Sequence, residues 1–283
     1  MSLDPPNRKR ESTCRKPLFY RDTRYQLGIV ERQLPAPLVK PLFRFQRFAI
    51  DDRQAAMKIG TDAVLLGSWT PLHGAKHILD VGTGCGIVAL MLAQRSESIG
   101  STVAAIDIDP AAAQQALDNF VQSPWPDRLP SVFSQIHKPL QQMDVAACPS
   151  FDLIVCNPPF FEPSPQLKAS SRKLARATET LDRMQLYQGA KSLLAGAGRL
   201  SMIIPFDQAE NAIDEAAGCG FQLVARTDVR PTPDSILKRS LLEFSLGPID
   251  AKPAHSELIV ETSRHVYSEQ YRALTKDFHL RYA

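Results

Sequence analysis

Between residues 75 and 245 the sequence alternates between short apolar runs and longer amphipathic stretches, and few folds accommodate this alternation. Apolar runs such as "HILDV" and "FDLIVC" have the length and composition of buried strands. The stretch "DPAAAQQALDNFVQ" is typical of a helix, with Asp109 as its cap and Pro110 in its first turn. We therefore predict an α/β fold, a doubly wound and mostly parallel sheet of seven strands with helices on both faces.

The carboxyl-terminal part of this pattern departs from strict alternation. A helix is predicted over residues 181–198, where a pair of glycines would close it. The last two predicted strands, 221–229 and 238–247, are joined by a short proline-rich loop without a helix. Because a short link of this kind cannot return the chain for a parallel strand, we expect an antiparallel hairpin at the sheet edge.

Composition and charge bound the organisation of the chain. Residues 1–40 hold nine Lys/Arg against four Asp/Glu and many prolines, so we predict a basic, disordered tail there and a single domain over residues 41–283. The tail is either an RNA-binding arm or merely solvated. The five cysteines form no C-x-x-C pair, which argues against a disulfide framework or a zinc site. No apolar run is long enough to cross a bilayer, so we expect a cytoplasmic protein without a membrane or metal partner.

A glycine-rich turn follows the first predicted strand of the alternating region. In "LDVGTGCG", Asp80 precedes Gly82, Gly84 and Gly86, and the next predicted strand ends at Asp107. Glycines at a strand-to-helix turn let the backbone approach a ligand closely, and a carboxylate at the end of the next strand can accept two ribose hydroxyls. The spacing is neither that of dinucleotide binders nor that of a phosphate loop.

A second motif, Asn157-Pro158-Pro159-Phe160, directly follows the run "FDLIVC". Two consecutive prolines cannot continue a sheet ladder, and they make the elbow rigid. An amide and an aromatic ring at the carboxyl end of a buried strand therefore indicate a binding function, although a proline-stiffened loop with buried aromatics would leave the same pattern.

The two motifs together resemble class I S-adenosylmethionine (SAM) methyltransferases, which have a Rossmann-like fold. The resemblance implies that SAM is the cofactor, that Asp80 and the three glycines line its site, and that Asp107 holds the ribose. Such enzymes often carry an acid beside the adenine after the third strand. Here that stretch reads "FSQIHKPLQQ", so no residue is assigned to the adenine.

"NPPF" is similar to the [DNS]-P-P-[YFW] motif of methyltransferases that act on a planar conjugated nitrogen. The lone pair of such a nitrogen is delocalised, so catalysis needs acceptors aimed at the NH₂ group. The resemblance gives this role to the Asn157 side-chain oxygen and the Pro158 carbonyl, with Asn157 also beside the cofactor. Pro159 would stiffen the elbow and Phe160 would stack on the target.

The flanks narrow the target. "FRFQRFAIDDRQAAMKIGTDAVLLGSW", over residues 43–69, reads as an aromatic-basic strand and then a small helix, and "YSEQYRALTKDFHLRY" ends the chain. Both resemble the bacterial tRNA1(Val) adenine-37 N6-methyltransferase family, over about residues 42–283. That resemblance implies tRNA as partner, N6-methyladenosine as product, and Lys58, Thr61 and Asp62 at the cofactor mouth. Thr61 and Asp62 would equally suit a helix cap.

Basic residues in two segments are candidates for holding RNA phosphates. One segment is the aromatic-basic strand, with Arg44 and Arg47, and the other is the loop after Phe160, with Lys168, Arg172, Lys173 and Arg176. The alternative for the loop is a solvated surface segment. Guanine-N2 methylation of rRNA, methylation of a protein glutamine, and an RNA-binding protein with a decayed methyltransferase fold remain open as other functions. We expect a monomer.

Overall fold

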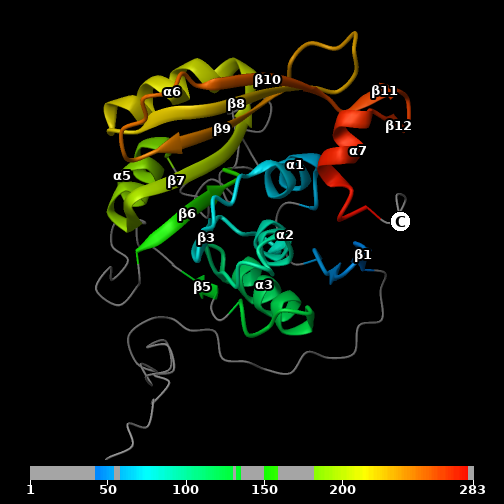
Figure 1. Cartoon of the computed structure of the whole chain (residues 1–283). Helices are drawn as coiled ribbons and strands as arrows, with labels where there is room; N and C mark the ends of the chain where they lie inside the picture. Colours follow the sequence, from blue (N-terminus) through cyan, green and yellow to red (C-terminus); the bar gives the residue numbers. More distant parts are fainter. Residues whose placement is uncertain (1–41, 54–57, 130–131, 135–149, 159–181, 280–283) are drawn as a thin grey trace, which may run out of the picture.

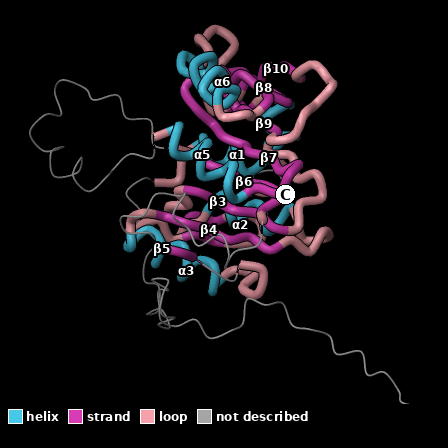
Figure 2. The backbone as a smooth tube through the Cα atoms, turned by 90° about the vertical axis from the view of Figure 1, so that its left-hand side faces the viewer, coloured by secondary structure: helices cyan, strands magenta, loops and turns pink. Residues whose placement is uncertain are grey.

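A single sheet of eight strands runs through the protein, in the order β10-β8-β9-β7-β6-β3-β4-β5 (Figures 1 and 2). The computed structural model describes residues 42–53, 58–129, 132–134, 150–158 and 182–279. The strands of the sheet are β3 (His77–Val81), β4 (Thr102–Asp107), β5 (Val132–Ser134), β6 (Phe151–Cys156), β7 (Leu194–Pro205), β8 (Gln222–Arg230), β9 (Arg239–Ser245) and β10 (Ala254–Ile259). The predicted tail, residues 1–40, lies outside the described part of the chain.

The predicted doubly wound sheet is confirmed. β3 pairs in parallel with β4 and β6, β4 with β5, and β6 with β7. The predicted antiparallel hairpin of β8 and β9 is also present, with β9 between β7 and β8, but its predicted place at the sheet edge is wrong, because β10 covers β8. β10, an additional strand, pairs in parallel with β8 and extends the sheet to eight strands.

Two elements differ from the sequence-based expectation. The helix predicted over residues 181–198 ends at Leu193, and Leu194 already begins β7. Glycine disfavours a helix, so Gly196 and Gly198 favour an end of the helix before them. A Cβ at Gly198 would lie 2.8 Å from Leu194 Cδ2, so a larger residue would crowd the start of β7. β10 has mostly exposed side chains and no apolar alternation, and lateral side-chain bonds, such as Thr227 Oγ1 to Ser256 Oγ at 2.8 Å, join it to β8.

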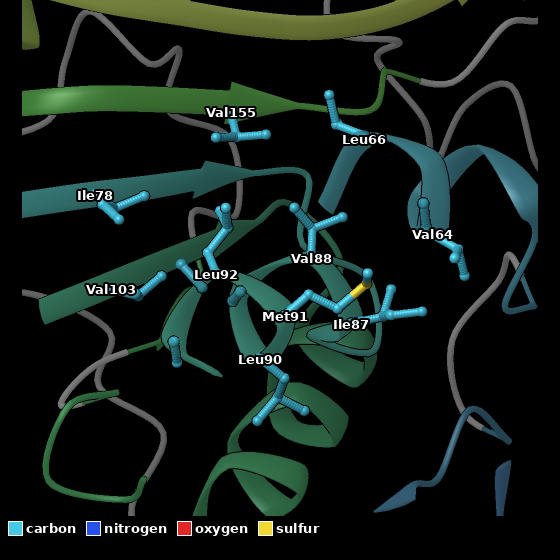
Figure 3. Packing of buried hydrophobic residues seen from close by; sticks show 14 of the residues in the cluster. Val64, Leu66, Ile78, Ile87, Val88, Leu90, Met91, Leu92, Val103 and Val155 are labelled. Atoms are coloured by element: carbon cyan, nitrogen blue, oxygen red, sulfur yellow. The ribbon is translucent and has the colours of Figure 1, made fainter. Parts of the chain in front are cut away.

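Helices cover both faces of the sheet (Figure 1). One face carries α1 (Thr61–Trp69), α2 (Ile87–Arg95), α3 (Pro110–Gln122) and α7 (Glu269–Thr275), and the other carries α5 (Arg183–Leu193), α6 (Ala209–Gly218) and the short 3-10 helix η4 (Phe206–Gln208). Figure 3 shows Val88 and Leu92 of α2 pointing toward the strands that carry Ile78 and Val155. Burial of these apolar side chains supplies the main stabilisation of the domain.

α1 is fixed on α2 at the carboxyl ends of the central strands. A Cβ at Gly67 would lie 2.7 Å from Met91 Sδ, so the two helices meet closely at that glycine. Arg95 Nη1 donates to the carbonyls of Gly67 and Thr70, both at 2.8 Å, and so satisfies the end of α1. The small helix expected between residues 43 and 69 is thus confirmed.

The segment before α1 folds as a small hairpin rather than one strand, with β1 (Phe43–Arg44) antiparallel to β2 (Ala49–Ile50). It rests on the end of α7, where Gln46 Nε2 donates to the carbonyls of Lys276 and His279. After β10 the chain forms a second hairpin, β11 (Glu261–Ser263) with β12 (Val266–Tyr267). None of the helices in the described ranges is long and apolar enough to cross a membrane.

Arg128 joins the end of α2 to the start of β4. Its guanidinium donates to the carbonyls of Ala93 (2.8 Å), Ser96 (3.0 Å) and Ser101 (2.9 Å), and to Ser96 Oγ at 2.8 Å. The fork of donors therefore satisfies carbonyls that a helix terminus leaves without partners.

Replacing Arg128 should destabilise the domain. We expect Arg128→Ala to lower the free energy of unfolding by about 2–4 kcal/mol, because the carbonyls around α2 lose a charged donor. Arg128→Lys should lose less, since an ammonium keeps the charge but not the fork. Urea unfolding measures both. Arg272→Ala, at an exposed position of α7, is the control and should change stability by less than about 0.5 kcal/mol. Equal effects of Arg128→Ala and the control would contradict the role given to Arg128.

Candidate functional site

The glycine loop between β3 and α2 has a backbone that glycine alone adopts without strain. Gly82, Gly84 and Gly86 have φ values of 71°, 57° and 87°. A Cβ added at Gly82 or Gly84 would meet no atom within 4 Å among the described residues, whereas one at Gly86 would lie 2.5 Å from the Phe120 ring. The first two glycines therefore leave open backbone for a ligand, and the third allows α3 to pack against the loop.

Asp107 ends β4 and holds this loop in place. Its Oδ2 accepts from Gly84 N at 2.8 Å, and its Oδ1 accepts from Asp109 N at 2.9 Å. Burial raises the pKa of the Asp107 carboxyl above its usual range, and the backbone donors oppose that shift. Asp109 caps α3 as predicted, accepting from Ala111 N at 2.9 Å. Asp107 remains a predicted acceptor for ribose hydroxyls.

Asp80 lies beneath the loop and is 1% exposed. Its Oδ2 accepts from Thr83 Oγ1 at 2.6 Å and from Ala89 N at 3.2 Å. Burial raises the pKa of Asp80 to about 7, because a low-dielectric environment disfavours the carboxylate; the two donors act in the opposite direction. This carboxyl fixes the loop to the start of α2, and a nearby cation would favour its charged form.

Asn157 follows β6 at the same edge of the sheet, since Cys156 is in register with Val81 of β3. Its side-chain Oδ1 is buried and has no hydrogen-bond partner among the residues that the structure describes. A buried acceptor without a partner is costly, so it is expected where a ligand completes the hydrogen bond. Pro158 is buried beside it, whereas Pro159 and Phe160 lie outside the described residues.

Of the residues predicted at the cofactor mouth, Lys58 and Asp62 make contacts within the protein. Lys58 Nζ donates to Asp52 O at 2.7 Å, so its ammonium is held by the segment that precedes it. Thr61 is the first residue of α1, and Gly60, without a side-chain capping bond, is the N-cap. The alternative of Thr61 or Asp62 as a helix cap is therefore wrong. Asp62 Oδ2 instead accepts from Arg239 Nε at 2.7 Å.

The basic residues predicted to bind RNA divide into three groups. Arg44 is exposed on β1. Arg47 is exposed but engaged, with its Nη1 2.7 Å from Glu97 Oε2 and its guanidinium carbon 5.1 Å from the Trp125 ring centroid. Lys168, Arg172, Lys173 and Arg176 lie outside the described residues, as does the stretch 135–149 that includes the expected adenine contact.

One feature of the site was missed in the sequence. Ile108, directly after Asp107, is 40% exposed, which is unusual for a large apolar side chain at the end of a core strand. The position of Ile108 between Asp107 and Asp109 was the sequence signal that could have indicated its exposure. One edge of the sheet thus brings together the glycine loop, the Asp107 carboxyl, the exposed Ile108 side chain and the Asn157 amide. The described part of the chain has no group of three His, Cys, Asp or Glu side chains that could hold a metal ion.

The fold is that of methyltransferases. The solved structure of a predicted O-methyltransferase from Agrobacterium tumefaciens matches with a TM-score of 0.55 at 21% identity, covering 77% of this chain and 96% of that one. A family model described as "Methyltransferase small domain" matches residues 55–208, which include the glycine loop, Asp107 and the NPPF motif.

Curated relatives specify the family further. The tRNA1(Val) (adenine(37)-N6)-methyltransferase of Parabacteroides distasonis is 40% identical over 244 residues, covering 86% of this chain and all of that protein. The protein of the same name from Flavobacterium psychrophilum is 40% identical over 241 residues, covering 85% of this chain and all of that protein. The chain therefore belongs to the family of tRNA1(Val) (adenine(37)-N6)-methyltransferases.

The raised pKa of Asp80 makes a prediction about stability and pH. Between the ordinary carboxyl pKa and about 7, the folded state binds more protons at Asp80 than the unfolded state, so this group lowers stability as pH rises. Asp80→Asn cannot lose a proton. From pH 5 to pH 8 its free energy of unfolding should therefore gain roughly 2 kcal/mol relative to the wild type.

Urea unfolding at the two pH values, without ligand, measures this difference. Asp234→Asn, at an exposed loop position, is the matched control and should follow the wild-type profile. If the Asp80→Asn profile also runs parallel to that of the wild type, the proton at Asp80 is not retained on folding.

Proposed function

We propose that this protein transfers a methyl group from SAM to the exocyclic N6 of an unpaired adenine in tRNA, with adenine-37 of tRNA1(Val) as the target. The proposal is carried by the buried Oδ1 of Asn157 beside the glycine loop, which has no hydrogen-bond partner in the described ranges, in a chain 40% identical to enzymes named for that reaction. The identity extends over the full length of those relatives, so it includes the parts that flank the site.

The residues at the carboxyl edge fit SAM. Gly82 and Gly84 leave open backbone that a ligand can approach, and we assign the ribose hydroxyls to Asp107, whose carboxylate has lone pairs beyond its two backbone donors. Ile108 offers an exposed apolar surface for one face of the adenine ring of SAM. When bound, SAM would supply an activated methyl group on a positively charged sulfur, and we assign the buried Asp80 carboxyl to the same site, where it holds the glycine loop. We assign Lys58, which precedes α1, and Thr61, its first residue, to the same site.

Asn157 and Pro158 are proposed to act on the target nitrogen. The N6 lone pair is delocalised into the adenine ring, so the amine must pyramidalise before it can attack. Asn157 Oδ1 and the Pro158 carbonyl accept hydrogen bonds from the NH₂ group and stabilise the positive charge that develops on nitrogen. In the reaction the nitrogen would form a bond to the methyl carbon, the sulfur of SAM would keep the electron pair of the broken carbon–sulfur bond, and the nitrogen would release one proton to water. Because the oxygen of Asn157 has no partner to give up among the residues that the structure describes, little reorganisation is needed.

The remainder of the motif and the basic residues are proposed to hold RNA. Pro159 stiffens the elbow, and Phe160 stacks on the adenine after it leaves its own stack. Arg44 and the loop residues Lys168, Arg172, Lys173 and Arg176 contact phosphates. Arg47 contributes less, because Glu97 and Trp125 already hold it.

We further propose that residues 41–283 form one catalytic domain that works as a monomer in the cytoplasm, where tRNA is processed. The described cysteines Cys85, Cys156 and Cys219 are free thiols, which fits a reducing compartment. Residues 1–40, with nine Lys/Arg against four Asp/Glu, are either an RNA-binding arm or a solvated tail.

The product identifies the function. Purified protein, methyl-labelled SAM and tRNA from a strain that lacks the gene should give label in N6-methyladenosine of a tRNA that reads valine codons. We expect this target because an anticodon loop offers unpaired bases at low cost. Label in N2-methylguanosine, or only in a protein, would contradict the assignment of adenine as the target. Absence of any transfer with bound SAM would favour an RNA-binding protein with a decayed site.

Asn157 should matter for the transition state more than for binding. We expect Asn157→Ala to lower kcat by about 10²–10³, as loss of one preorganised hydrogen-bond partner does elsewhere, with the Kd for SAM and tRNA little changed. Asn157→Asp is the matched control, because it retains an acceptor oxygen, and it should lose less activity. Kinetics at saturating SAM and binding at fixed salt measure these terms. A loss confined to tRNA affinity would contradict the role of Asn157 in catalysis.

A further inference from the structure

Asn119 is a polar residue on the buried face of α3 and is 2% exposed. Asparagine is a weaker helix former than alanine, and burying a primary amide costs free energy unless its donors and acceptor are paired. The partners of this amide therefore indicate its use. All three lie outside α3 and belong to backbone.

Two of the partners belong to Asp51, which directly follows β2. Asp51 N donates to Asn119 Oδ1 at 2.9 Å, and Asn119 Nδ2 donates to Asp51 O at 2.8 Å. The side chain thus pairs with a residue as the backbone of a neighbouring strand would. The Asp51 carboxylate accepts from Arg53 N at 3.0 Å, which turns the chain toward α1.

The third partner is in the glycine loop. Asn119 Nδ2 also donates to Cys85 O at 2.8 Å, immediately before Gly86, the N-cap of α2. The next residue of α3, Phe120, fills the space beside Gly86. Two successive residues of α3 therefore set the second half of the loop, one by a hydrogen bond and one by its ring.

Asp51 also leads into the segment that enters α1. Asp52 Oδ2 accepts from Ile59 N at 3.3 Å, and Asp52 O accepts from Lys58 Nζ at 2.7 Å. These bonds hold Asp52 next to Lys58 and Ile59, which directly precede α1. Through Asn119, the position of this segment and the conformation of the glycine loop depend on each other.

We propose that Asn119 is a positioning residue that couples cofactor binding at the glycine loop to the placement of Asp51 and Asp52. The inference rests on the proposed function, because it takes the loop as the SAM site. Aspartate at this position would lack both donors and glutamine would be one methylene longer, so asparagine is the side chain that matches the three backbone groups.

The first test separates affinity from turnover. Asn119→Ala and the milder Asn119→Ser should raise the Kd and KM for SAM about tenfold or more, with kcat at saturating SAM within about threefold of the wild type. A purely structural defect would reduce the active fraction and leave KM unchanged. Gln114→Ala is the matched control, since Gln114 Nε2 donates to Asp118 Oδ1 of the same helix at 2.8 Å, and it should leave Kd and KM unchanged.

The second test is hydrogen exchange with and without SAM. In the wild type, SAM should slow exchange in residues 80–90 and also in residues 50–53. In Asn119→Ser, saturating SAM should protect the loop but no longer residues 50–53. Wild-type protein that fails to bind SAM would overturn the proposed function. Wild-type binding that protects the loop alone, or an Asn119→Ser variant with normal KM and both segments protected, would overturn this inference and leave the proposed function standing.

Discussion

The site depends on the parallel pairing of β3 with both β4 and β6. In that register Val81 lies opposite Ile106 on one side and Cys156 on the other, so three strands end at nearly the same level. Each strand is followed by a chemically distinct group: the glycine loop after β3, Asp107 at the end of β4 and Asn157 after β6. Parallel strands make this convergence possible because all their carboxyl ends lie at one edge.

Buried polar groups are concentrated at this edge. Asp80 and Asp107 each accept two hydrogen bonds, mostly from the backbone that they hold, and burial raises the pKa of both carboxyls. Asn157 Oδ1, in contrast, lacks a partner in the described part of the chain. Two of these groups therefore hold the glycine loop, while the third is a buried acceptor of the kind that the proposed, preorganised catalysis requires.

The elements before β3 and after β10 are fixed to the domain next to this edge. α1 is fixed on α2 by Arg95 and by close packing at Gly67, and the β1–β2 hairpin is fixed on the end of α7 by Gln46. Segments far apart in the sequence thus meet beside the strand ends (Figure 1). The hydrogen bonds of Arg95 and Gln46 go from side chain to backbone, so they fix where these segments lie.

The sequence by itself determined the order of strands and helices, the glycine loop, the acid at the end of β4, the cap at Asp109 and the amide after β6. These features are local: a strand's apolar run, a helix cap and a glycine with positive φ depend on neighbours a few residues away. Only the tertiary structure decided that β7 begins at Leu194, that β10 joins the sheet, that Thr61 is not a cap and that Asn119 links Asp51 to Cys85. Each of these outcomes depends on partners distant in the chain, and the periodicity of one segment carries no information about which distant backbone it will meet.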